Sequence, residues 1–144
     1  MDNFTWGYDP EFFLETENGD LYPSIGLFGG TKENKNPLPQ LGVGFGIEED
    51  NVAVEMTAPP AKTKEEFVSN LQKMVTCLKE DLIPSLHVKG LKLSSKASGN
   101  FSDEHLQSDQ ACTFGCSPEL CAYSYNVFAA DAAVAGNFRT CGGH

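Results

Sequence analysis

The sequence has no long apolar run and comparatively little positive charge. No stretch approaches the ~20 apolar residues that a membrane-spanning helix needs. The N-terminal segment lacks the basic start and apolar run of a secretory signal peptide. Ten basic residues stand against 20 acidic ones, giving a net charge of -10, and such a surface repels nucleic-acid phosphates. We therefore expect a cytoplasmic protein that binds neither membranes nor nucleic acid, and whose acidic surface suits metal ions or cationic groups.

Several catalytic motifs are also missing. The segment "GGTKEN" lacks the G-x4-G-K-[ST] frame of a phosphate-binding loop, although it carries Lys32. No serine elbow or Cys–His catalytic pair stands out. The odd count of 5 cysteines favours reduced thiols over a disulfide framework. Two interpretations of the later cysteines stay open, small buried hydrophobes or a structural zinc site with unusual spacing, and the second would use Cys112, Cys116, Cys121, Cys141 and His144.

The clearest element is a helix from Thr63 to Leu82. Thr63 and Glu66 form a capping box at its start, apolar residues recur at helical spacing, and Pro84 is expected to close it. No linker or repeat divides the chain, so residues 1–144 are expected to form a single domain.

Strand-like segments cluster on both sides of this helix. A hairpin is expected from Glu11–Glu15 through a turn at Asn18–Gly19 to Leu21–Ile25. Residues 26–46 are expected to be a loop that ends in a strand near Leu41–Phe45, and "EEDNVAVEMTAPP" to be the next strand. Because strands and helices do not alternate, we predict an α+β fold in which one long helix packs on a mainly antiparallel, curved sheet.

Two expected strands carry carboxylates on one face. In "YDPEFF", Asp9 and Glu11 alternate with apolar residues and share a side of the strand. Two such carboxylates repel each other unless a cation compensates them, and Mg²⁺ prefers oxygen ligands; the other interpretation is a solvated acidic strand end. In "DNVAVEM", Asn51 and Glu55 share a face opposite the valines. Either that face is open to solvent or Glu55 points into a pocket.

The C-terminal stretch "FRTCGGH" is the third candidate. Its glycines leave room for a ligand or a second backbone to approach. Arg139 can hold a phosphate or carboxylate through two parallel hydrogen bonds, and His144 is a possible metal ligand or proton carrier. The other interpretation is a terminal loop with a surface histidine.

The order of these motifs resembles a known family. "GYDPEFFL", "GGTKENKNPLP", "DNVAVEMTAPPAKTKEEFVSNL", "GCSPELCAY" and "FRTCGGH" follow one another as in the phage-encoded carboxylate–amine ligases, the amidoligase type 2 family. That family is distantly similar to glutamine synthetase and glutamate–cysteine ligase. The resemblance implies a glutamine-synthetase-like catalytic domain in the cytoplasm of a phage's host, with ATP and Mg²⁺ as cofactors and carboxylate and amine substrates.

The implied chemistry is amide-bond formation through an acyl phosphate. By motif position, the resemblance implies that Glu11 and Glu55 hold metal, with help from Asp9 and Asn51. It implies that Arg139, together with Lys32, contacts the nucleotide phosphates or the substrate carboxylate, and that His144 is a metal ligand or phosphate contact.

The family's sequence continues past this histidine, whereas the present sequence ends there. We therefore expect an incomplete ligase domain that needs its C-terminal part for catalysis. The alternative is a truncated, non-catalytic, ligase-like domain that acts as an interaction protein. An open sheet edge would then allow self-association or pairing with a completing fragment.

Overall fold

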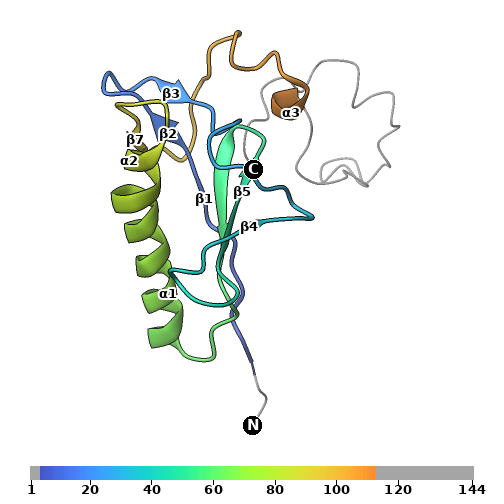
Figure 1. The fold of residues 1–144 in the computed structure, drawn as a ribbon, viewed down its shortest axis with the longest axis vertical. Coiled ribbons are helices and arrows are strands. Elements are labelled where there is room, and N and C mark those ends of the chain that lie inside the picture. Colours follow the sequence, from blue (N-terminus) through green and yellow to red (C-terminus); the bar gives the residue numbers. More distant parts are fainter. Residues whose placement is uncertain (1–3, 113–144) are drawn as a thin grey trace.

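The structure of the protein, a computed structural model, describes residues 4–112. It confirms the α+β class: one long helix packs beside two antiparallel sheets (Figure 1). The strands are β1 (Glu11–Phe12), β2 (Leu14–Glu15), β3 (Leu21–Tyr22), β4 (Asn36–Pro37), β5 (Gly46–Asp50), β6 (Ala53–Thr57) and β7 (Lys92–Leu93). The helical segments are α1 (Lys64–Cys77), η1 (Leu78–Leu82), α2 (Ile83–Ser85) and α3 (Asp109–Cys112).

The larger sheet has the strand order β1-β6-β5-β4, and all its neighbours are antiparallel. Its centre is a hairpin in which Asp50 pairs with Ala53, so that Asn51 and Val52 form the turn. Asn51 has a φ of 54°, a left-handed conformation that asparagine tolerates better than most residues. The expectation of a single strand across "EEDNVAVEM" is therefore wrong, because the chain reverses at Asn51.

The smaller sheet has the order β3-β2-β7. The hairpin between β2 and β3 is confirmed, with Gly19 in its turn at a φ of 85°. Its first strand is not continuous from Glu11 to Glu15, however. The chain leaves the larger sheet after Phe12 and enters the smaller one at Leu14, while the Phe13 carbonyl accepts a hydrogen bond from the Ser94 N–H. One run of β-prone residues thus serves two sheets.

The loop before the hairpin also differs from expectation. No strand forms at Leu41–Phe45; β4 lies earlier, at Asn36–Pro37, and β5 begins at Gly46. The Leu38 N–H donates to the Phe45 carbonyl, and a tight turn fills the interval between them. The loop therefore contributes an edge strand that sequence periodicity does not reveal.

The helix begins as predicted. The Thr63 hydroxyl accepts a hydrogen bond from the Glu66 N–H at 3.1 Å, and the Glu66 carboxylate accepts one from the Lys62 N–H at 2.6 Å. The first contact satisfies a backbone donor that the first helical turn leaves unpaired, and the second ties the residue before the N-cap to that turn.

The helix ends later than predicted. It was expected to stop at Leu82, before Pro84, but it continues through Pro84. The wider turn of η1, in which the Ile83 N–H donates to the Leu78 carbonyl, leads into α2, which ends at Ser85. Pro84 lies in the last turn of this continuous helical run, and the wider turn before it accommodates a residue that cannot donate a backbone hydrogen bond.

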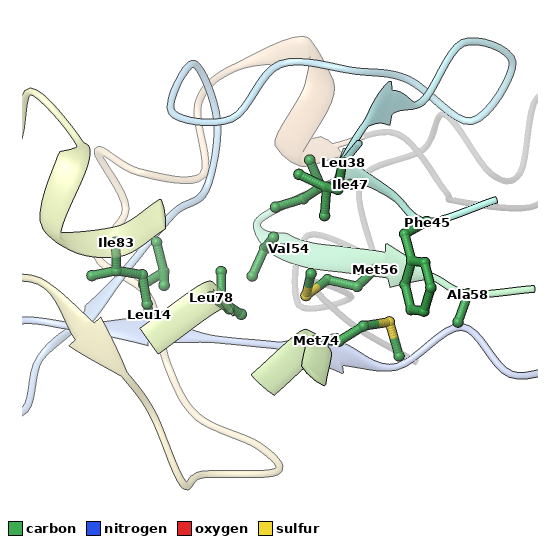
Figure 2. Close-up of a cluster of buried hydrophobic side chains, with 10 residues drawn as sticks. All are labelled: Leu14, Leu38, Phe45, Ile47, Val54, Met56, Ala58, Met74, Leu78 and Ile83. Atoms are coloured by element: carbon green, nitrogen blue, oxygen red, sulfur yellow. The ribbon is translucent and has the colours of Figure 1, made fainter. Parts of the chain in front are cut away.

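The main core lies between this helix and the larger sheet. Figure 2 shows Met74 and Leu78 facing Val54 and Met56 of β6. All four side chains are fully buried, and burial of each contributes on the order of 1.5–3 kcal/mol. In β6, Glu55 lies between Val54 and Met56, and because side chains alternate along a strand it faces the opposite side of the sheet.

No helix among residues 4–112 has the length and apolar character needed to cross a membrane.

Candidate functional site: an acidic sheet face

The face of the larger sheet that looks away from the helix carries a group of carboxylates. We call this group the acidic face; it comprises Asp9, Glu11, Glu48, Asp50 and Glu55. The register in which β1, β6 and β5 pair explains why these carboxylates lie together. Glu11 of β1 is the cross-strand partner of Glu55 on β6, and Glu48 of β5 is the partner of Glu55 on its other side. Directly paired residues in adjacent strands share a face, so three glutamates form one row across three strands.

Three carboxylates of this face converge most closely. Glu11, Asp50 and Glu55 each offer an oxygen, and these oxygens all lie within 4.8 Å of one another. Within residues 4–112 this is the one group of three or more potential metal-ligating side chains that meets so closely. Glu11 is exposed, whereas Asp50 and Glu55 are half-buried, so the group is open to solvent from the β1 side.

A lysine is inserted into the acidic face from the segment before β4. The Lys35 Nζ donates to Glu48 Oε1 at 2.6 Å and to Glu55 Oε1 at 2.9 Å. It also donates to the Thr57 hydroxyl at 2.6 Å. The Glu48 side chain is only 3% exposed, and a carboxylate so deeply buried requires a partner of opposite charge. Lys35 is that partner.

The charges of this face perturb one another. Burial raises the pKa of the Glu55 carboxyl above its ordinary value, and the neighbouring Glu48 carboxyl raises it further, while Lys35 offsets these effects only in part. Burial alone would lower the pKa of Lys35, but its hydrogen bonds to Glu48 and Glu55 outweigh that effect and raise it. Lys35 therefore stays charged, whereas the ionised form of Glu55 is disfavoured mainly by burial and further by Glu48.

Asp9 lies at the other end of the face from the converging group. Its Oδ1 accepts a hydrogen bond from the Thr57 hydroxyl at 3.0 Å and lies 4.0 Å from the Lys35 Nζ. Asp9 and Glu11 share a face, as expected from the alternation, since Thr57, which binds Asp9, lies on the same side of β6 as Glu55.

The other residues singled out in the sequence are placed differently. Asn51 is nearly buried in the turn that directly follows Asp50, so it lies beside the acidic face rather than in its row. Lys32 is exposed in a short turn closed by Thr31 and Asn34. Arg139 and His144 lie outside the described residues, and so do Cys116, Cys121 and Cys141. Of the zinc candidates only Cys112 is described; its thiol donates to the Leu106 carbonyl at 3.0 Å.

Sequence reasoning missed Glu48, Asp50 and Lys35. A signal for the first two existed: a two-residue turn at Asn51–Val52 pairs Glu48 with Glu55 by counting alone. No such signal existed for Lys35, because its position depends on the course of a glycine-rich loop.

Glu49, which lies between Glu48 and Asp50 on β5, has a different role. Glu49 faces the opposite way, and its carboxylate accepts hydrogen bonds from the N–H groups of Gly26, Phe28 and Gly29 at 2.6–2.8 Å. It therefore fixes the glycine-rich loop from which Lys35 extends. Alternation along β5 separates a structural glutamate from the two carboxylates beside it.

Comparisons with protein families, with curated proteins and with solved structures found no significant match to this chain.

Proposed function

We propose that the acidic face binds a divalent cation and forms part of the nucleotide site of an ATP-dependent carboxylate–amine ligase. The observation that carries the proposal is the cross-strand pairing of Glu11 with Glu55, which brings together oxygens from two motifs 44 positions apart, with Asp50 as a third donor. A chain in which these motifs lay on opposite faces would not support it.

The donor set fits a hard cation. All three groups are carboxylates, the ligands that Mg²⁺ and Ca²⁺ prefer, and thiols and imidazoles are absent from the group. Solvent access through exposed Glu11 suits Mg²⁺, which retains several waters and is commonly held by few carboxylates together with substrate phosphates. Mg²⁺ bound there would neutralise phosphate oxygens during phosphoryl transfer.

The ligase assignment rests on the ordered motifs rather than on the metal group alone. In this proposal Glu11, Asp50 and Glu55 hold the cation, and Asp9 and Asn51 support the two ends of the site. Lys32 and Arg139 hold phosphate or the substrate carboxylate, because both are cations carried by motifs of the same ordered set. His144 is a further metal or phosphate contact. The reaction joins a carboxylate, activated as its acyl phosphate, to an amine.

The test is ligand-dependent stabilisation. Mg²⁺, alone and with a non-hydrolysable ATP analogue, is expected to raise the melting temperature, because a ligand that binds only the folded state stabilises it. Glu11→Gln and Glu55→Gln are expected to remove that rise. Glu80→Gln, which neutralises an exposed glutamate of the helix, is the matched control and should retain it. A rise that survives both substitutions on the acidic face would refute the metal site.

The ligase activity needs a separate measurement. Release of ADP and phosphate from ATP should depend on the joint presence of an amine and a carboxylate, screened as amino acids and short peptides. Metal binding without such turnover would leave the cation site standing and remove the ligase proposal.

A second function, an interaction module of the same ancestry, is favoured by one observation. Within residues 4–112, β1 has a hydrogen-bonded neighbour on one side only, and an open edge can accept a strand from another chain. Association that increases with protein concentration, measured by sedimentation, would support this function, and a monomer at all concentrations would contradict it.

A further inference from the structure

Lys35 and the proposed cation share the same carboxylate. The Lys35 Nζ lies 2.9 Å from Glu55 Oε1. The Glu55 carboxylate also converges with those of Glu11 and Asp50. Glu55 is therefore shared between a group of carboxylates that is suited to a metal ion and a lysine that the protein itself supplies.

The remaining contacts of Lys35 do not involve the converging group. Its ammonium also donates to Glu48, at 2.6 Å, and to the Thr57 hydroxyl, at 2.6 Å. The lysine can therefore lose its bond to Glu55 and still compensate buried Glu48. This arrangement differs from a simple salt bridge, in which the loss of one partner leaves the ammonium without any.

We infer that Lys35 is a built-in competitor of the divalent cation: its ammonium holds Glu55 in the unloaded protein and must release it for the cation to bind Glu11, Asp50 and Glu55 together. This inference rests on the proposed function and adds to it a residue that sets the affinity of the site. A positive charge beside the cation and a shared ligand both act against binding. The role of Lys35 is thus to keep the site weak unless further negative charge, such as nucleotide phosphate, arrives with the metal.

The experiment is calorimetric titration of the full chain with Mn²⁺, in wild type, in Glu11→Gln and Glu55→Gln, and in three lysine variants. Lys35→Met is expected to bind Mn²⁺ roughly tenfold more tightly, because one opposing charge and one competing hydrogen bond disappear. Lys79→Met removes an exposed lysine of the helix, on the opposite side of the sheet, and should bind within about twofold of wild type.

Lys35→Met leaves Glu48 buried without its partner and so can fail to fold. The double variant Lys35→Met/Glu48→Gln removes that problem and keeps the net charge of wild type. If Lys35 competes directly for Glu55, the double variant still binds severalfold more tightly than wild type. If only the summed charge of the face mattered, it would bind like wild type, and that result would overturn the inference.

The two proposals fail separately in this experiment. Wild-type binding that Glu11→Gln and Glu55→Gln abolish, combined with no gain in the double variant, would retain the cation site and refute the competition. Absence of Mn²⁺ binding in wild type and in the double variant alike would refute both. Binding that appears only when Lys35 is removed would support both.

Discussion

Each of the two sheets contains a glutamate whose side chain has the same exposed fraction, but the pKa values of the two carboxyls are shifted in opposite directions. The side chains of Glu15 on β2 and Glu55 on β6 are both 13% exposed, and both contact lysine. Glu15 accepts a hydrogen bond from the Ser94 hydroxyl at 2.7 Å and lies near Lys92 and Lys96, and these contacts lower its pKa. For Glu55, burial and Glu48 raise the pKa. Equal side-chain exposure therefore does not imply equal desolvation or equal roles.

The difference lies first in desolvation, which dominates at Glu55, and then in how many cations accompany each carboxylate. Glu15 is one carboxylate with two lysines, so its charge is fully compensated. On the acidic face, the single ammonium group of Lys35 is shared by three carboxylates, those of Asp9, Glu48 and Glu55. An excess of negative charge that persists in a folded protein costs stability, and sites that bind ligands commonly carry such a cost. Glu15 fixes the smaller sheet, whereas Glu55 is the carboxylate to which the proposed function assigns a cation.

The largest change in the free energy of unfolding should appear when the lysines that pair with Glu55 and Glu15 are removed in turn. Lys35→Met leaves Glu48, whose side chain is 3% exposed, without its cation, and should lower the free energy of unfolding by roughly 2–3 kcal/mol. Lys92→Met should have a much smaller effect, because Lys92 is 55% exposed and Glu15 keeps Ser94 and Lys96. Urea denaturation at pH 7 measures both. Equal losses would contradict the contrast between a buried and a screened pair.

The sequence predicted part of this arrangement. Alternation in "YDPEFF" and "DNVAVEM" correctly placed Glu11 and Glu55 on strand faces opposite their apolar neighbours. Their meeting depends on antiparallel pairing of β1 with β6, which is a long-range contact that no local pattern encodes. Glu48 was accessible to the same reasoning but required the turn at Asn51, and it was missed because one continuous strand was expected.

The fold shows the same division between local and long-range information. The start of the helix at Thr63 follows from its cap and was predicted. The division of residues 11–15 between two sheets was not, because it results from competition between β6 and β7 for neighbouring residues. The continuation of the helix past Pro84 depends on the wider turn before it, which apolar periodicity does not report.

Replacing each glutamate by glutamine, which removes the charge and keeps the shape, should change the free energy of unfolding by an intermediate amount. The change should have opposite signs for Glu55 and Glu15. Glu55→Gln removes the repulsion from Glu48 and leaves an amide oxygen to accept from Lys35, so it should raise the free energy of unfolding by roughly 1 kcal/mol. Glu15→Gln removes a carboxylate that three donors favour, so it should lower that free energy. Thermal and urea unfolding in the absence of divalent cations provide the measurement. Destabilisation by Glu55→Gln would show that Lys35 compensates the acidic face completely.

The smallest expected effect is on the pH dependence of stability, and it compares Glu15 and Glu55 most directly. The pKa of Glu15 in the folded state lies below the ordinary value of 4.5, so its stabilising contribution is complete above that pH and is lost as the pH falls towards the folded-state pKa. The pKa of Glu55 lies above 4.5, so its unfavourable contribution is absent below that pH and develops as the pH rises towards the folded-state pKa.

The two carboxyls should therefore titrate on opposite sides of pH 4.5, and carboxyl ¹³C chemical shifts assigned with the Glu15→Gln and Glu55→Gln variants resolve them. Mg²⁺ sharpens the test, because a cation held by Glu55 favours the ionised form and should move its titration to lower pH while that of Glu15 stays fixed. Since both side chains are equally covered, a shift of Glu55 alone would reflect bound charge rather than a general effect of salt. A parallel shift of both would indicate ionic screening and would remove the distinction between the two glutamates.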